Sequence, residues 1–441
     1  MEQLLFAARD ALWGGGTIAL LLGVGVFLTF RTRFLPLRNL GGALRLALGS
    51  SSRRAGEGGI SPFSALMTAL SATIGTGNIV GVATALVSGG PGALVWMELS
   101  SLPGLATKFS ECLLAVKFRR RDARGQWVGG PMYVMRDTLG RFGGVLAVLF
   151  SLATLLVAFS MGSMTQSNAI AGALETSFGV PPRRAGLATA LIALCVILGG
   201  IHSISRMAEV LVPVMALGYM AAGLWVVACH LDALPGALSL MVREAFSFRA
   251  AAGGAAGAAF RYGVARGVLT HEAGLGSAAI TAACSEDGDP LRQGYTGMTA
   301  VVFDAFLLCT VTGLAICCAG VLGNTDGNGT PLTGAALTIA AFETVFGKAG
   351  GDLLSLSVVL FAFSSILGWA YQGECAFSFL FGLRFRLVYR LVFAAAAFYG
   401  AVASLETVFA LSDLCNALMC FPNLVCLLLL SGTVAKEARK T

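Results

Sequence analysis

Charged residues are scarce in this sequence. Asp, Glu, Lys and Arg make up 12% of the 441 residues, 56% are hydrophobic, and the mean hydropathy is +0.80. The charged share is about half that of soluble globular domains, so lipid must be the solvent for most of the chain. Since one span needs roughly 20 apolar residues, the composition predicts about ten to twelve spans. A soluble nucleotide-binding enzyme, a nucleic-acid-binding protein and an outer-membrane barrel are excluded together.

Residues that commonly hold metals or perform catalysis are also sparse or badly spaced. The eleven cysteines include no CxxC pair and no zinc-type spacing, so we interpret them as small buried hydrophobic residues. The three histidines, His202, His230 and His271, form no HExxH pattern. A membrane-embedded enzyme is therefore disfavoured, and a channel is disfavoured because no repeated pore loop is visible. We predict that the protein is not an enzyme.

Apolar runs bounded by charges, glycine or proline predict an all-α polytopic membrane protein with eleven spans. Two runs, 187–200 and 391–403, are short, so we expect their true ends in the flanking segments. The eleven runs cover residues 14–30, 61–87, 94–116, 145–174, 187–200, 208–229, 251–280, 294–321, 353–380, 391–403 and 407–430.

The distribution of Lys and Arg predicts the orientation of these spans. Alternate connecting segments hold 21 basic residues on one side and five on the other. Because basic loops stay in the cytoplasm, the N-terminus is predicted outside and the C-terminus inside a cell (inner) membrane. We interpret the basic side as a topology signal that contacts anionic lipid, not nucleic acid.

The second span contains polar and small residues where a membrane helix normally has none. Gly75, Thr76, Gly77 and Asn78 lie at its middle, near bilayer depth. An unpaired backbone group in hydrocarbon is very unfavourable, so a break there must line a cavity. Freed amides suit a carboxylate and freed carbonyls suit a small cation. The alternative is a small-residue face for helix packing.

The seventh span repeats this pattern, with charged residues between glycines at 258–280. Two interrupted spans in halves of opposite orientation are typical of secondary transporters. We therefore predict a five-plus-five inverted repeat. Residues 1–60 form an extra N-terminal helix and a cytoplasmic linker, 61–230 the first repeat, 251–432 the second repeat and 433–441 a cytoplasmic tail.

Five separated motifs resemble one transporter family. They are ATIGTGNIVG (72–81), GGPMYVM (129–135), ARGVLTHEAGLGSA (265–278), FAFSSILGWAYQGE (361–374) and LSDLCNALMCFPNL (411–424). In this order they resemble the alanine or glycine:cation symporter family over nearly the whole chain. The resemblance implies the fold of the sodium-coupled leucine transporter and inward carriage of small neutral amino acids with sodium, sometimes with protons. A proton-coupled amino-acid carrier on the same fold is the alternative.

The resemblance also implies which residues bind the amino acid. The amides of Thr76 and Gly77 would hold its carboxylate, Gly75 would allow close approach, and Asn78 would brace the break or face the substrate. In the second half, Phe260 to Gly263 would offer carbonyls to the ammonium and an aromatic wall. Gln166 and Asn168, which are polar residues deep in a span, would supply further acceptors. Trp369, in the middle of an apolar span, would cap the side-chain end of the pocket. For Gln166 and Asn168 the alternative is interhelical hydrogen bonding, and for Trp369 it is core packing.

The same resemblance implies a sodium site without a carboxylate. The hydroxyls of Ser364 and Ser365 would join the carbonyls of Ser71, Ile74 and Phe361, which suits a hard cation with about five or six oxygen ligands. Proton-coupled relatives carry a lysine on the fifth core helix, whereas residues 208–229 contain no Lys or Arg. This difference favours sodium as the coupling ion.

Several charged residues lie within predicted spans. Lys108 and Glu111 are three residues apart, so we expect them to pair. Asp304 is interpreted as a gate or helix-cap partner, with a proton relay as the alternative.

Overall fold

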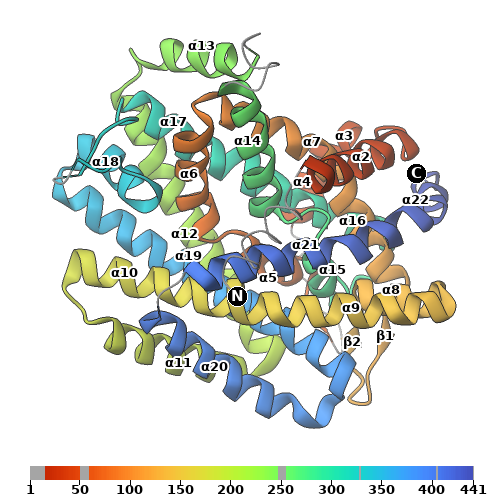
Figure 1. Cartoon of the computed structure of the whole chain (residues 1–441). Helices are drawn as coiled ribbons and strands as arrows, with labels where there is room; N and C mark the ends of the chain where they lie inside the picture. The colour runs from red at the N-terminus through yellow and green to blue at the C-terminus, as the bar shows by residue number, and fades with distance from the viewer. Residues whose placement is uncertain (1–14, 50–58, 247–254, 327–328, 404–405, 441) are drawn as a thin grey trace.

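Helices form almost all of the chain, because a helix satisfies its own backbone hydrogen bonds in lipid. The structure is a computed structural model that describes residues 15–49, 59–246, 255–326, 329–403 and 406–440. Within these residues the named strands are β1 (Arg120–Arg121) and β2 (Trp127–Val128), which pair antiparallel. Figure 1 shows the helices packed around one another, with this hairpin at one end.

The helices fall into two successive groups along the chain. The first group comprises α2 (Gly15–Arg31), α3 (Leu35–Arg38), α4 (Leu40–Leu48), α5 (Pro62–Thr73), η2 (Thr76–Asn78), α6 (Val80–Gly89), α7 (Gly92–Lys117), α8 (Pro131–Thr138), α9 (Gly140–Phe159), η3 (Ser160–Thr165), α10 (Gln166–Phe178), α11 (Pro182–Leu198), α12 (Gly200–Cys229) and α13 (Leu234–Ala245). The second comprises α14 (Ala255–His271), α15 (Ser277–Ala282), α16 (Pro290–Val301), η5 (Val302–Cys309), α17 (Thr310–Cys318), α18 (Gly334–Phe346), α19 (Lys348–Phe381), η6 (Leu383–Phe385), α20 (Arg386–Val402), α21 (Glu406–Leu429) and α22 (Ser431–Ala438).

The number of spans is only partly settled by helix length and composition. Six helices in the described chain are long and apolar enough to cross a membrane, and the bent pair formed by α5 and the half-helix after it makes a seventh. The predicted count of eleven is therefore not confirmed. The two short predicted runs do extend into their flanks, since α11 begins at Pro182 and α20 at Arg386. Helices α13 and α18 lie between predicted spans and were not anticipated.

The predicted break in the second span is confirmed. Helix α5 starts with Pro62 in its first turn, after Ser61, whose hydroxyl accepts from the Ser64 amide. It ends at Thr73, and the helical half Thr76–Gly89 continues at an angle of 60°. A Cβ on Gly75 would lie 2.5 Å from Ser365 Oγ, so the close approach of these two segments requires glycine.

The second break lies later in the chain than the sequence suggested. Helix α14 is continuous to His271, and α15 starts at Ser277. Between them Glu272, Gly274 and Gly276 have φ values of 53°, 100° and 78°. This left-handed backbone favours glycine and cannot continue a right-handed helix.

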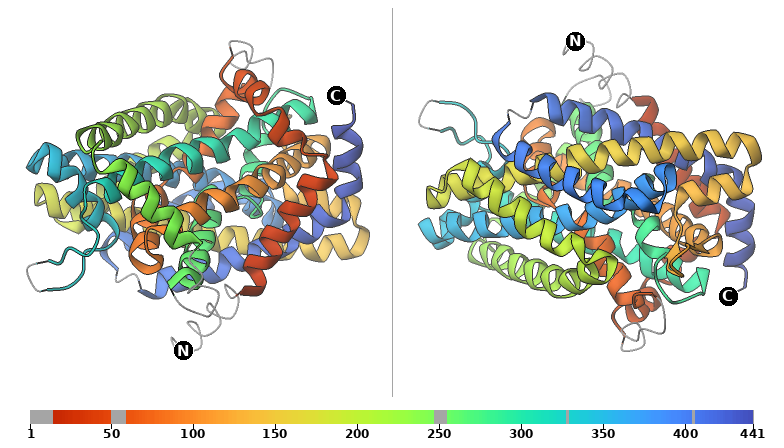
Figure 2. Two further views of the ribbon diagram at one scale, coloured as in Figure 1. Left: turned by 90° about the horizontal axis from the view of Figure 1, so that it is seen from above. Right: turned by 90° about the horizontal axis from the view of Figure 1, so that it is seen from below.

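The two broken spans lie side by side and run antiparallel. Gly77 faces Thr270, while Gly89, at the other end of α6, faces Ala258 of α14. Helix α5 packs against α12, α15 and α19, and α14 packs against α6 and α7. In Figure 2, α11 and α20 run together along one side of the bundle. The two breaks are thus surrounded by helices from both halves of the chain.

Candidate functional site

Five predicted cation ligands meet where α5 ends. Ser364 Oγ lies 2.9 Å from the carbonyl oxygen of Phe361, 3.3 Å from that of Ser71 and 3.4 Å from that of Ile74. Ser365 Oγ lies 3.4 Å from the same Ile74 oxygen. All five residues are buried. The structure therefore gathers two hydroxyls and three carbonyls at one point.

No alternative metal site competes with this cluster in the described part of the chain. There, no group of three or more His, Cys, Asp and Glu residues is arranged to hold a metal ion. The oxygens gathered around Ser364 and Ser365 are neutral hydroxyl and carbonyl oxygens, which are ligands that hard cations accept.

Thr76 and Gly77 begin the second half of the broken span. As the first residues of the helical half Thr76–Gly89, they carry amides with no partner in a preceding turn, at the positive end of the helix dipole. Both residues are partly exposed, whereas Gly75 and Asn78 are buried. The geometry leaves Thr76 and Gly77 available to an anionic group.

Asn78 and Gln166 hold the broken segment. Asn78 Oδ1 accepts from the Gly75 amide at 3.2 Å, so Asn78 braces the break, one of its two predicted roles. Thr76 Oγ1 donates to Gln166 Oε1 at 3.3 Å, and Gln166 Nε2 donates to the Met161 carbonyl at 3.2 Å. Gln166 thus lies at the break, on the first turn of α10.

Asn168 lies near the site with its donors already used. Its Nδ2 donates to the carbonyls of Gly400 and Ala403, at 3.1 Å and 3.3 Å. This is the interhelical hydrogen bonding that the sequence left open. Its side chain still lines a cavity that reaches Thr76.

Phe260 and Gly263 do not lie at the second break. Both belong to the continuous helix α14, in which carbonyls bond to amides four residues on, so the expectation that they offer free carbonyls is wrong. Phe260 is 38% exposed and packs edge-on against Trp96, with ring centroids 4.9 Å apart. A Cβ on Gly263 would overlap Ala93 of α7. The glycine serves close helix packing, which composition alone does not distinguish from a break.

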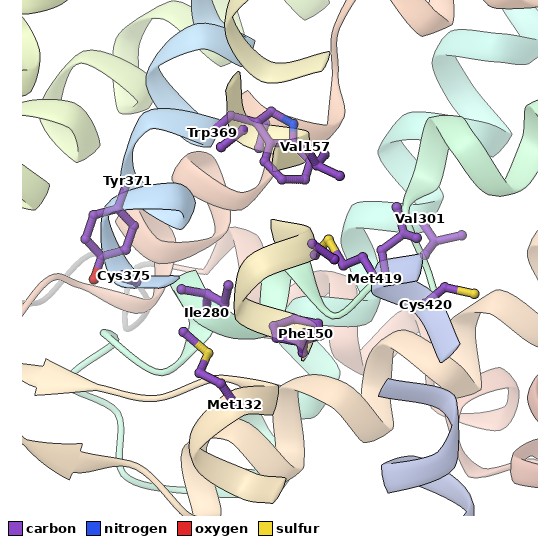
Figure 3. Close-up of a cluster of buried hydrophobic side chains, with 14 of the residues drawn as sticks. Met132, Phe150, Val157, Ile280, Val301, Trp369, Tyr371, Cys375, Met419 and Cys420 are labelled. Atoms are coloured by element: carbon purple, nitrogen blue, oxygen red, sulfur yellow. The ribbon is translucent and has the colours of Figure 1, made fainter. Parts of the chain in front are cut away.

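Trp369 is fully buried, one turn after Ser365 on α19. Figure 3 shows its indole beside Val157, among the buried apolar side chains, and Gly162 gives it room. This position agrees with core packing. Its Nε1 makes no hydrogen bond of standard geometry among the described residues, but it faces the buried carboxylate of Glu272.

A cavity of about 400 Å³ leads away from the break. It begins at Thr76, follows α10 to Thr176, and is closed on the far side by α18 and the first turns of α19. Figure 1 shows α10, α18 and α19 together on this side of the bundle. Its volume falls within the range of about 300–1,000 Å³ that is usual for small-molecule sites.

Ion pairs lie near the other end of α19. Arg390 binds Glu374 through two nitrogens, at 2.6 Å and 2.8 Å. Arg386 lies 3.6 Å from Glu374 and 3.5 Å from Asp122 beside the β1–β2 hairpin. Ser355, which lines the cavity, and Glu374 are 19 residues apart on α19. The cavity and the ion pairs are therefore separated by roughly 28 Å along this helix.

Sequence reasoning missed the partners of the two breaks. Asp304 Oδ1 accepts from Asn78 Nδ2 at 2.7 Å. Glu111 Oε1 accepts from the amides of Gly274 and Gly276, at 2.9 Å and 3.1 Å. Among the described contacts Glu111 makes no ion pair with Lys108, whose Nζ donates instead to the Glu272 carbonyl at 3.2 Å. The predicted Lys108–Glu111 pair is therefore absent there.

Comparison with known protein families shows which family the chain belongs to. A model of the sodium:alanine symporter family matches residues 1–440. The chain belongs to this family. Its members include the sodium/alanine symporter AgcS of Methanococcus maripaludis, which is 43% identical over 99% of this chain and 96% of its own. The amino-acid carrier protein AlsT of Bacillus subtilis is 32% identical over 95% of this chain and 87% of its own.

Solved structures establish the fold. A Na⁺-coupled sialic acid symporter in its substrate-bound outward-open state aligns with a TM-score of 0.55 and 13% identity, over 88% of this chain and 82% of its own. MhsT in complex with L-phenylalanine aligns with a TM-score of 0.51 and 12% identity, over 86% of this chain and 100% of its own. This member of the sodium:alanine symporter family is an all-α, multi-pass membrane protein with the fold of the sodium-coupled leucine transporter.

Proposed function

We propose that this secondary active amino-acid transporter couples the entry of sodium to the entry of small neutral amino acids, alanine and glycine among them. The family match and the transporter relatives support secondary active transport of amino acids. The coupling ion, the substrate and the direction are inferred from the site.

The arrangement of oxygens around Ser364 carries the proposal of sodium. A hard cation about 2.4 Å from each ligand separates neighbouring oxygens of an octahedral shell by about 3.4 Å. The three contacts of Ser364 Oγ and the one of Ser365 Oγ span 2.9–3.4 Å. A cation at the centre would draw these five oxygens together with little rearrangement. Residues 208–229 of α12, which packs against α5, supply no Lys or Arg in its place.

The amino acid would bind beside this sodium. Its carboxylate would be held by the amides of Thr76 and Gly77 at the start of a half-helix. Gln166 would meet the polar end of the substrate, since its Oε1 already contacts Thr76 Oγ1. Trp369, buried one turn from Ser365, would cap the side-chain end of the pocket and limit the size of the substrate. These features favour alanine and glycine over leucine or phenylalanine.

Access would alternate between the two ends of α19. The cavity along α10 reaches Thr76, and the Arg390–Glu374 pair near the opposite end would be the gate there. The basic ends of α2, α7, α20 and α22 would lie on the side of the Arg390–Glu374 pair. There Lys117 of α7 pairs with Glu437 of α22, and Arg386 of α20 with Asp122. With basic residues in the cytoplasm, the N-terminus lies outside, the C-terminus inside, and the cavity faces outward. Residues 61–230 and 251–432 would be the two repeats that exchange these states.

Uptake into proteoliposomes tests the proposal. Labelled alanine should accumulate when an inward sodium gradient is imposed and should not accumulate with potassium in place of sodium. Unlabelled glycine should compete for uptake, and phenylalanine should not. Equal uptake driven by a proton gradient without sodium would replace the proposal with a proton-coupled carrier.

A further inference from the structure

Each broken segment is held by a buried carboxylate from a different span. At the first break Asp304 Oδ1 accepts from Asn78 Nδ2 at 2.7 Å, and the Asp304 carbonyl accepts from the same nitrogen at 3.3 Å. These contacts fix the carboxamide so that Asn78 Oδ1 accepts from the Gly75 amide at 3.2 Å. Asp304 is therefore two hydrogen bonds away from Gly75, which packs against Ser365.

The second break is held in a similar way by Glu111. Its Oε1 accepts from the amides of Gly274 and Gly276, which have left-handed backbone and no helical partner. Asn423 of α21 donates to the same Oε1 at 2.7 Å and to the Gly274 carbonyl at 2.9 Å. Glu111 and Asn423 thus bind the freed amide and the freed carbonyl of one residue, Gly274.

The two carboxylates are exchanged between the halves of the chain. Glu111 lies on α7, directly after the first broken span, and holds the second break. Asp304 lies in η5, in the span directly after the second break, and holds the first. Each half therefore supplies the residue that fixes the broken segment of the other half.

Both carboxylates are buried, so their desolvation must be offset by favourable contacts. Asp304 is 0% and Glu111 2% exposed, and neither forms an ion pair among the described residues. A buried carboxylate at membrane depth is strongly unfavourable, but a freed amide there is unfavourable too. Hydrogen bonds from amides to a carboxylate relieve both, and they are about twice as strong as neutral ones.

We propose that Asp304 and Glu111 are positioning residues that keep the two breaks in their binding geometry. Asp304 acts on the sodium and carboxylate sites through Asn78 and Gly75. Glu111 acts on the Glu272–Gly276 loop and so on α15, which packs against α5. The inference rests on the proposed function for its transport readout only, because the backbone effect is measurable without substrate.

Hydrogen exchange of the purified full chain in nanodiscs tests the backbone effect. Loss of a hydrogen bond to a charged group changes a local opening equilibrium roughly 10- to 150-fold. Asp304→Ala should therefore speed exchange by at least about tenfold in peptides covering 74–80 and leave those covering 272–278 unchanged. Glu111→Ala should do the reverse. Asp304→Asn and Glu111→Gln keep an acceptor oxygen and should restore slow exchange to within about threefold of the wild type.

Glu98→Gln is the matched control. Glu98 lies on the same helix as Glu111, and its Oε1 accepts from Thr310 Oγ1 at 2.9 Å instead of from a break. It should leave both peptides unchanged. Faster exchange over the whole chain in both Ala variants, or unchanged exchange at both breaks, would overturn the inference.

A second variant covers the case in which Asp304→Ala does not fold. Asn78→Ala cuts the same link from the other side and should speed exchange at 74–80 alone. Unchanged exchange there would also overturn the inference.

In transport, Asp304→Ala should raise the sodium concentration needed for half-maximal uptake at least about tenfold, and Asp304→Asn should restore it. A wild-type protein that binds no sodium would instead refute the proposed function and leave the exchange result standing.

Discussion

Removing the hydroxyl of Ser364 should weaken sodium binding far more than it weakens the fold. This hydroxyl is fully buried and contacts the carbonyls of Ser71, Ile74 and Phe361. In the sodium-free protein the hydroxyl has one proton to share among these carbonyls, so it donates about one neutral hydrogen bond, which contributes about 0.5–1.5 kcal/mol. With sodium bound, the same oxygen would be a ligand of a desolvated cation.

The size of the effect follows from that difference. Loss of one polar partner of a buried charged group costs about 1–3 kcal/mol, which is a factor of roughly 5 to 150 in affinity. We expect the sodium midpoint of Ser364→Ala to rise by this factor. Ser365→Ala should also raise it, since Ser365 Oγ lies 3.4 Å from the Ile74 carbonyl. Alanine affinity at saturating sodium should move much less, because coupling between two sites is a separate free energy.

The assay is a sodium titration of alanine binding to the purified protein. Ser357→Ala is the matched control, because Ser357 lies on the same helix, is 8% exposed and, among the described contacts, donates to the Leu353 carbonyl of its own helix, at 2.9 Å. It should keep the wild-type midpoint. Wild-type midpoints in both Ser364→Ala and Ser365→Ala would refute the assignment of the sodium site. An equal shift in the Ser357 variant would show that the method reports stability and not ligation.

Two further predictions concern the substrate and the membrane topology. Trp369→Ala should admit longer side chains, so leucine should compete better with alanine for uptake; an unchanged competition profile would remove Trp369 from the pocket. A single cysteine at position 52, in place of Ser52, should be labelled only from the cytoplasmic side, since basic residues gather in that segment. Ser52 lies outside the described residues, and labelling from the outside would invert the orientation.

The first break could be predicted from sequence because the membrane makes it conspicuous. In a soluble protein the run Gly75 to Asn78 would suggest an ordinary turn. At bilayer depth each freed backbone group needs a partner, so the same four residues indicate a lined cavity. The structure confirms the break and places Ser364 and Ser365 against it.

The second break could be expected but not located. Four glycines are spread along 258–280, and two of them serve packing: Gly263 fits against Ala93 and Gly267 against Met97, both on α7. The break falls instead at Gly274 and Gly276, where positive φ values require glycine. The signal in the sequence was a pair of glycines, Gly274 and Gly276, that follow Glu272 and are separated by a single residue. A helix-packing glycine and a turn glycine look the same until the neighbouring helix is placed.

The residues that hydrogen-bond to the two breaks could not be predicted from the sequence, because their partners lie far away along the chain. Asn78 and Asp304 are 226 residues apart, Glu111 and Gly274 163, and Glu111 and Asn423 312. Local spacing instead suggested that Glu111 pairs with Lys108 on its own helix. A helical pair three residues apart makes one favourable contact, but freed amides at membrane depth each need an acceptor, and a hydrogen bond from such an amide to a carboxylate contributes about 1.5–3 kcal/mol. Glu111 therefore accepts from the amides of Gly274 and Gly276, while Lys108 donates to the Glu272 carbonyl.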